Sequence, residues 1–283
     1  MDIESIAVIG AGTMGNGIAQ VCAASGFPVI MTDVSQMALD RGMKAIVGSL
    51  DRMVDRQKIN SSDKDRALGR LTTATAMDAV KDCDLIIEAA TENPDLKLRI
   101  FADLDKLAKP SAIIASNTSS ISITRLAAAT GRADRVIGMH FFNPVPVMAL
   151  VEIIAGLQTS DAVRESVANV VAKLGKAVVN VRNAPGFVVN RLLCPMLNEA
   201  CFALGEGLAT AKDIDEAMKL GCNHPIGPLA LCDMVGLDVV LAVMDVLYDS
   251  FRDSKYRPAP LLIEMVEAGH LGRKSGRGFY VYS

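Results

Sequence analysis

Short apolar runs separated by amphipathic stretches fill the chain as far as residue 182. The runs are of strand length and rich in β-branched residues: Ile6–Ile9, Val29–Thr32, Leu85–Glu88, Ala112–Ser116, Val136–His140, Leu150–Ile154 and Ala177–Val181. Most are apolar throughout, which is typical of strands covered on both faces of a largely parallel sheet. Helical periodicity lies between them, as at Gly15–Ala24, Met37–Arg56 and Leu96–Leu107. We therefore predict an α/β fold with a doubly wound, mostly parallel sheet, whose later strands allow antiparallel pairs.

The pattern changes beyond Asn183-Ala184-Pro185-Gly186, a cluster of loop-forming residues. From there to about residue 269 no segment is a convincing strand, and the helical segments are Val188–Glu206, Ala211–Leu220, Leu237–Ser250 and Pro260–Ala268. We predict a first domain of residues 1–183 and a smaller, all-helical domain of residues 184–283. A helical domain of about 100 residues rarely buries all its apolar surface alone, so we also expect a homodimer.

Composition and charge narrow the classes of partner. The chain is 51% hydrophobic and 22% charged, as in an ordinary globular protein. Its net charge of −3 provides no field to hold nucleic acid or an anionic membrane, so neither is an expected partner. The first residues lack the basic start of a targeting peptide, and the apolar runs are too short to cross a bilayer. Both features favour a cytoplasmic protein.

Metal-binding residues are few and scattered. The six cysteines occur singly, without a C-x-x-C pair, and the three histidines lie far apart in sequence. Structural zinc sites place such residues at short, regular spacings. We therefore expect free thiols and no metal.

A glycine-rich turn joins the first apolar run to the helical segment after it. Its sequence, Gly10-Ala11-Gly12-Thr13-Met14-Gly15, is a G-x-G-x-x-G motif between a strand and a helix. The first glycine permits a tight turn, the second lets the backbone approach a pyrophosphate, and the third allows close packing of helix on strand. The helix N-terminus offers N–H groups to the anion. The turn predicts a dinucleotide site in a Rossmann-type domain.

Asp33 indicates which dinucleotide binds. It follows the second apolar run and lies near the spacing of ~20 residues expected of the carboxylate that binds the adenine ribose hydroxyls. A carboxylate at that position repels a 2′-phosphate, and no arginine follows immediately. We therefore expect NAD rather than NADP.

Three further segments carry polar residues where a plain core would not. Ser116-Asn117-Thr118-Ser119-Ser120 and His140-Phe141-Phe142-Asn143-Pro144-Val145-Pro146 each follow an apolar run, and Asn190-Arg191 opens the first helix of the second domain. Ligands of open α/β sheets bind beyond the carboxyl ends of the strands. The first two segments occupy that edge together with the glycine turn, so we predict the functional site there.

Across the whole chain these motifs resemble the L-3-hydroxyacyl-CoA dehydrogenases in their single-function form, which includes the 3-hydroxybutyryl-CoA dehydrogenases. The matching segments, in order, are Gly10–Gly15, Glu88–Asn93, Ser116–Ser120, His140–Met148, Ala184–Arg191, Gly227–Asp238 and Gly272–Tyr280. The resemblance implies reversible, NAD-dependent oxidation of a short (S)-3-hydroxyacyl-CoA to the 3-oxoacyl-CoA. It leaves open the chain length and the pathway, whether fatty-acid breakdown, butanoate metabolism or storage-polymer supply.

The resemblance also implies four catalytic residues. His140 is the general base for the 3-hydroxyl proton, since the imidazole pKa of ~6.5 permits proton transfer in both directions near neutrality. Glu152 holds the other ring nitrogen, as the acid of a serine-protease triad does. Ser119 and Asn190 hydrogen-bond the substrate and orient the reacting carbon.

Contacts with the two ligands follow from the same resemblance. Those expected to touch the cofactor, besides the glycine turn and Asp33, are Glu92, Lys97, Asn117, Asn143 and Lys274. Ser49 matches a position that contacts CoA, and Arg56 stands where the family has a lysine near the CoA phosphates. Arg52 can present a second guanidinium group beside Arg56, and such groups suit phosphate. The two arginines are four residues apart and share a helix face, which is also the pattern of an ordinary solvated surface.

Two alternatives use the same motifs. One is a dehydrogenase of a free hydroxy or sugar acid on a related two-domain plan. The other is a non-catalytic NAD-binding protein, such as the lens crystallins related to this family. The complete set of Ser119, His140, Glu152 and Asn190 argues against the second, because a structural role does not require all four.

Overall fold

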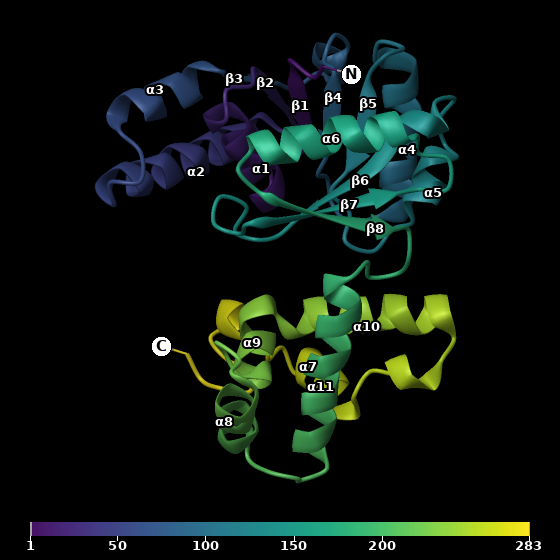
Figure 1. The fold of residues 1–283 in the computed structure, drawn as a ribbon. Helices are drawn as coiled ribbons and strands as arrows, with labels where there is room; N and C mark the ends of the chain where they lie inside the picture. Colours follow the sequence, from purple (N-terminus) through teal and green to yellow (C-terminus); the bar gives the residue numbers. More distant parts are fainter. Residues whose placement is uncertain (1, 283) are drawn as a thin grey trace. The chain divides into compact units, whose positions relative to one another are not determined.

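The computed structural model describes residues 2–282, and the chain divides into two compact units between Ala184 and Pro185. The first unit contains one eight-stranded sheet with helices around it (Figure 1). In chain order the strands are β1 (Ile6–Ile9), β2 (Val29–Thr32), β3 (Leu71–Ala74), β4 (Leu85–Glu88), β5 (Ile113–Ser116), β6 (Val136–Phe141), β7 (Leu150–Ala155) and β8 (Ala177–Arg182).

The spatial order of the strands is β3-β2-β1-β4-β5-β6-β7-β8. Strands β1 to β6 are parallel, β7 runs antiparallel to β6, and β8 is parallel to β7. The chain therefore reverses its direction of winding between β1 and β4, the switch point where doubly wound sheets bind ligands. The predicted Rossmann-type, mostly parallel α/β sheet with a helical second part is confirmed.

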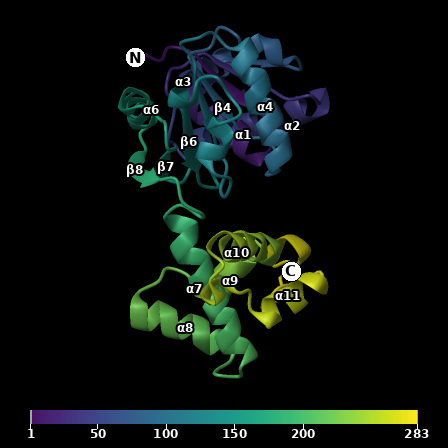
Figure 2. The ribbon, with the colours of Figure 1, turned by 90° about the vertical axis from the view of Figure 1, so that its right-hand side faces the viewer.

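Helices cover both faces of this sheet. They are α1 (Thr13–Ala24), α2 (Gln36–Asp55), α3 (Ser61–Gly69), α4 (Pro94–Leu107), α5 (Ile123–Ala127) and α6 (Asp161–Lys173). Figure 2 shows α6 and α4 on opposite sides of the strands. Polar residues begin several of the helices, since the side chains of Ser35, Asn93 and Ser160 accept hydrogen bonds from the first turns of α2, α4 and α6.

Several strands of the first unit differ from the sequence prediction. The edge strand β3 has the sequence LTTA, and Leu71 is its one buried residue, so it lacks the continuous apolar run that marks most of the other strands. Strands β6, β7 and β8 each extend one residue further than predicted, and β5 begins one residue later. Edge strands have one partner and a partly solvated surface, which explains why hydrophobic pattern alone misses β3.

The second unit is built from α7 (Val189–Gly205), α8 (Ala211–Cys222), α9 (Pro228–Val235), α10 (Leu237–Phe251) and α11 (Pro260–Glu267). Helix α7 contacts the other four helices of this unit (Figures 1 and 2). Helix α9 is not among the predicted helical segments, because the proline and glycine residues at its start are typical of a loop. Pro228 is its first residue, a position at which a helix needs no N–H donor.

A buried aspartate accepts hydrogen bonds from residues 279–282 of this unit. The Asp233 carboxylate is 1% exposed and accepts hydrogen bonds from the backbone N–H groups of Phe279 and Tyr280 and from the hydroxyl of Tyr282. Gly278 lies so close to Asp233 that a Cβ there would meet its Oδ1 at 1.9 Å. We call residues 276–282 the C-terminal strap, and Asp233 holds it at three points.

Among residues 2–282, no helix combines the length and the apolar character needed to cross a membrane.

Candidate active site

The glycine turn has the geometry that its sequence predicts. Gly10 has a φ of +101°, and a Cβ there would meet the Ala89 carbonyl oxygen at 2.7 Å. A Cβ on Gly15 would lie 1.8 Å from the Gly10 carbonyl oxygen, which only glycine avoids. By contrast, a Cβ on Gly12 would meet nothing within 4 Å, and no side chain caps α1. The helix start is thus open on the side where a pyrophosphate would bind, so these residues fit NAD.

Asp33 stands next to this turn at the end of β2. Its Oδ2 accepts a hydrogen bond of 2.9 Å from the Ala11 N–H, and its Oδ1 accepts one of 3.0 Å from the Ser35 N–H. These bonds fix the carboxylate beside the glycine turn while each oxygen keeps further acceptor capacity for a ribose hydroxyl.

Neighbouring strands bring His140 and Glu152 together. The hairpin of β6 and β7 pairs the two residues directly across the ladder. His140 Nδ1 lies 2.7 Å from Glu152 Oε2, and Glu152 is 0% exposed. A carboxylate that accepts the Nδ1 proton leaves Nε2 as the acceptor of the ring.

Ser119, in the connection that follows β5, completes this cluster. Its Oγ is 3.2 Å from His140 Nε2. Asn117, two residues before, accepts a hydrogen bond of 2.9 Å from the Phe141 N–H and so ties the end of β5 to the end of β6. The structure therefore groups Ser119, His140 and Glu152 at the carboxyl edge of the parallel strands.

Asn143, Asn190 and Lys274 are further residues expected at the site, and each is described here within its own unit. Asn143 is exposed in the connection after β6 and precedes Pro144 through a cis peptide bond. Asn190 belongs to the second unit, at the start of α7. Lys274, in the same unit, donates to both carboxylate oxygens of Asp238 at 2.5 and 2.7 Å. Their expected roles stay predictions.

The residues expected near CoA lie on the second helix of the first unit. Ser49 and Arg52 belong to α2, and Arg56 is its C-cap. Ser49 is half-buried, whereas both arginine side chains are exposed. An exposed pair of guanidinium groups one helical turn apart is an arrangement that can bind phosphate.

Glu88 is a buried residue near the site to which the sequence motifs assigned no role. It ends β4 at the switch point, is 0% exposed and accepts a 2.6 Å hydrogen bond from Lys97 Nζ. The sequence contained a mark of this burial, because a carboxylate at the end of an apolar strand needs a buried partner.

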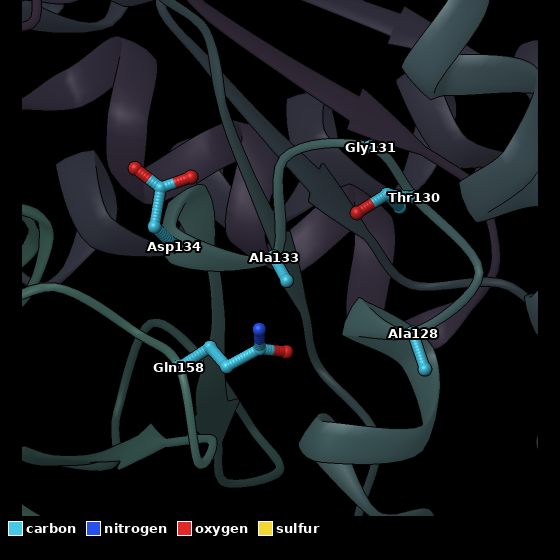
Figure 3. Close-up of a pocket in the computed structure, with 6 residues that line it drawn as sticks. All are labelled: Ala128, Thr130, Gly131, Ala133, Asp134 and Gln158. Atoms are coloured by element: carbon cyan, nitrogen blue, oxygen red, sulfur yellow. The ribbon is translucent and has the colours of Figure 1, made fainter.

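The hollow drawn in Figure 3 lies elsewhere in the first unit. It has a volume of about 620 Å³ and is lined by Ala128, Thr130, Gly131, Ala133, Asp134 and Gln158. These residues precede β6 or follow β7, at the edge of the sheet opposite His140. Asp134 is its one ionisable side chain, so it lacks the chemistry found at the carboxyl edge. Within residues 2–282, no three His, Cys, Asp or Glu side chains are arranged to hold a metal ion.

Comparison with known proteins identifies the family. The 3-hydroxyacyl-CoA dehydrogenase NAD-binding domain matches residues 5–184, and the C-terminal domain of the same family matches residues 186–282. The 3-hydroxybutyryl-CoA dehydrogenase of Bradyrhizobium diazoefficiens is 53% identical over 280 residues, which cover 99% of this chain and 96% of the relative.

Two crystal structures are similar over their whole length. The (S)-3-hydroxybutyryl-CoA dehydrogenase of Ralstonia eutropha is 60% identical with a TM-score of 0.97, and FadB2 of M. tuberculosis is 45% identical with a TM-score of 0.98. Each comparison covers 100% of both chains. The chain therefore belongs to the 3-hydroxyacyl-CoA dehydrogenase family, and its first unit is an NAD-binding domain.

Proposed function

We propose that the protein catalyses the reversible oxidation of (S)-3-hydroxybutyryl-CoA by NAD⁺ to acetoacetyl-CoA. The observation that carries this proposal is the buried His140–Glu152 pair, 2.7 Å apart, with Ser119 Oγ 3.2 Å from the second ring nitrogen. The names of two full-length relatives supply the substrate, since both are 3-hydroxybutyryl-CoA dehydrogenases.

His140 is the general base of the proposed reaction. Its Nε2 takes the proton of the 3-hydroxyl group as the carbon–oxygen double bond forms, and it returns that proton in the reverse direction. Glu152 accepts a hydrogen bond from the Nδ1–H group, keeps the ring in the required tautomer and stabilises the imidazolium that results. Because Glu152 is fully buried, its charge acts on the ring with little screening by water.

Ser119 and Asn190 orient the substrate in this proposal. The Ser119 hydroxyl lies within hydrogen-bond reach of Nε2 and can bridge the ring and the substrate oxygen. Asn190, in the second unit, would supply a side-chain amide donor, and the further proposed role of that unit is to close over the substrate.

The cofactor supplies the acceptor for the hydride that leaves C3. The glycine turn, with Gly10, Gly12 and Gly15 and the adjoining Thr13 and Met14, would hold its pyrophosphate at the start of α1. Asp33 would hold the adenine ribose and disfavour a 2′-phosphate, so NADPH should be a poor substitute.

The CoA moiety is assigned to Ser49, Arg52 and Arg56 on α2. Replacing both arginines by glutamine should raise the KM for acetoacetyl-CoA while kcat is kept, because phosphate contacts far from C3 contribute uniform binding. An unchanged KM would show that the two guanidinium groups form only a solvated helix face.

The experiment that tests the function is the oxidation of NADH with acetoacetyl-CoA, followed by absorbance. Parallel reactions replace NADH by NADPH and the thioester by free acetoacetate. Turnover with NADH and the thioester alone is expected. Comparable turnover of free acetoacetate would favour a dehydrogenase of free acids, and no turnover in any combination would favour a non-catalytic NAD-binding protein.

The second unit is also the proposed dimerisation surface. It leaves large apolar side chains exposed, among them Leu208 and Leu220 at 78% each. Exposed apolar residues of this kind are typical of subunit interfaces. Sedimentation at micromolar concentration should give the mass of a dimer, and a monomer would refute this part of the proposal.

A further inference from the structure

The connection between β6 and β7, residues 142–149, lies between the proposed base and the helix of the glycine turn. At its start the ring of Phe142 contacts the ring of His140, with the two centroids 4.6 Å apart. Further along, Val145 is buried against α1, where a Cβ on Gly17 would meet the Val145 Cβ at 2.9 Å. The position of this connection therefore affects the surroundings of the base and of the glycine-turn helix.

The connection has little regular structure of its own. Residues 142–149 contain no helix or strand, and the N–H groups of Val147 and Met148 both donate to the Pro144 carbonyl oxygen, at 2.9 and 3.0 Å. Asn143, which is expected to touch the cofactor, is exposed in this segment. Its position therefore depends on contacts between the connection and neighbouring elements.

Lys176, the residue before β8, supplies two of these contacts. Its Nζ donates hydrogen bonds to the carbonyl oxygen of Val145 at 2.7 Å and to that of Met148 at 2.6 Å. Hydrogen bonds from a charged donor are stronger than those from a neutral one. One ammonium group thus joins both ends of the turn at residues 145–148 to the start of β8.

The backbone of Lys176 is itself held in place at the end of α6. Gly175 follows the helix with a φ of +69°, in the left-handed region that glycine adopts readily. The Gly175 N–H donates to the Ala172 carbonyl oxygen at 3.0 Å, and the Lys176 N–H donates to that of Val171 at 3.2 Å. This pair of bonds is the pattern that closes a helix C-terminus. The ammonium group therefore extends from a fixed point of the backbone.

We propose that Lys176 is a positioning residue of the reaction. Its ammonium group holds residues 142–149 against α1, and so it fixes where Asn143 stands toward the cofactor and where Phe142 stands against the ring of His140. The inference deepens the proposed function and rests on it for the roles of Asn143 and His140. It adds to the candidate site a residue to which the sequence motifs assigned no role.

The test compares two variants of Lys176 with a matched control. Lys176→Met removes the donors and keeps most of the length of the side chain. Because Lys176 is half-buried and its partners are carbonyl oxygens, this change leaves no buried charge unpaired. Lys176→Arg keeps a cation with several N–H donors. The control is Lys173→Met, which removes from the same helix end an ammonium group that lies 5.7 Å from the centroid of the Phe27 ring.

We expect kcat with saturating NADH and acetoacetyl-CoA to fall by about 10-fold in Lys176→Met, since a small misplacement of groups near the reacting atoms has effects of this size. Titration with NADH should still saturate every chain, which shows that the lower kcat does not reflect a smaller folded fraction. Lys176→Arg should keep most of the wild-type kcat, and the control should keep all of it. A wild-type kcat in Lys176→Met, or an equal loss in Lys176→Met and Lys176→Arg, would overturn the proposal.

Amide hydrogen exchange separates this proposal from the proposed function, because it needs no turnover. The amides of Val147 and Met148 should exchange several-fold faster in Lys176→Met than in the wild type, while those of β6 and α1 keep their rates. Unchanged rates in residues 142–149 would overturn the positioning role, and so would faster exchange spread over the whole sheet. A wild-type protein inactive on every acyl-CoA would instead refute the proposed function, and the exchange rates would still decide whether Lys176 holds the connection.

Discussion

Glu152 in the sheet and Asp233 in the helical unit are both buried carboxylates, 0% and 1% exposed, but their partners differ. Glu152 pairs with an imidazole that can gain or lose a proton. Asp233 accepts from two backbone N–H groups and a phenol, which keep their protons at neutral pH.

The difference shows that burial of a carboxylate does not by itself mark a catalytic residue. A carboxylate whose donors are fixed stabilises local structure, whereas one whose donor titrates prepares a proton transfer. We therefore expect changes at His140 and Glu152 to affect turnover with little effect on folding. Changes at Asp233 should do the reverse.

The largest expected effect is that of His140→Ala, which removes the proposed proton acceptor. We expect kcat to fall by about 10³- to 10⁴-fold, equal to about 4–5 kcal/mol of activation free energy. NADH fluorescence should remain that of the wild type, and thermal unfolding should show that the variant is folded at the assay temperature, although loss of the partner of buried Glu152 lowers the midpoint. Gln158→Ala, on the opposite edge of the sheet, is the control. Turnover close to that of the wild type would show that His140 is not the base.

Glu152→Gln should have the next largest effect, because the amide keeps the size of the side chain but cannot stabilise an imidazolium. We expect kcat to fall by about 10²-fold, or about 3 kcal/mol. The unfolding midpoint should change little, since the amide oxygen can still accept a hydrogen bond from the Nδ1–H group. A large loss of stability with unchanged turnover would place Glu152 in the same class as Asp233.

Asp233→Asn makes the same chemical change in the second unit and should act on folding. The amide retains one acceptor for three donors, so we expect the unfolding free energy of this unit to fall by about 2 kcal/mol. All four tyrosines, Tyr248, Tyr256, Tyr280 and Tyr282, lie in this unit, and the chain has no tryptophan. Near-ultraviolet circular dichroism of tyrosine therefore reports on it specifically. A drop in kcat at temperatures where the unit is folded would contradict the assignment of Asp233 to folding and not to turnover.

The smallest expected effect is a dependence of the strap on alkaline pH. Burial, and then the hydrogen bond to Asp233, raise the pKa of Tyr282 above its ordinary value. The neutral phenol is thus favoured in the folded state, so its contribution is complete below the unfolded pKa of ~10 and is lost as pH rises through the folded pKa. Tyr282→Phe should lower stability by about 1 kcal/mol at neutral pH. Its difference from the wild type should shrink in strongly alkaline solution, and a constant difference would refute this account.

Hydrophobic pattern was sufficient for most of the sheet. Runs such as Leu85–Glu88 are apolar on both faces because helices cover both faces, and that environment is visible in sequence. Strand β3 was missed because Thr72 and Thr73 are exposed at a sheet edge. Helix α9 was missed because proline and glycine at its start resemble a loop.

Three of the residues predicted for the candidate site lie within hydrogen-bond distance of a partner among them, but the sequence did not indicate the network around them. The resemblance named His140, Glu152 and Ser119, and the hairpin register explains why the first two meet. It did not reveal that Lys97 is buried between Glu88 and Glu92, since a helix residue that follows an exposed turn has no sequence mark of burial. Such networks depend on side-chain packing across elements, which pattern alone does not contain.

The antiparallel register of β6 and β7 has a consequence for how this family can vary. His140 and Glu152 meet because they are opposed in the ladder, so residues 142–149 between the strands do not determine their distance. Insertions in that connection would alter what the loop presents to a ligand and leave the pair intact. A deletion of one residue early in β7 would turn Glu152 to the opposite face of the sheet. The ladder of the two strands, and not the length of the loop between them, therefore sets the distance between His140 and Glu152.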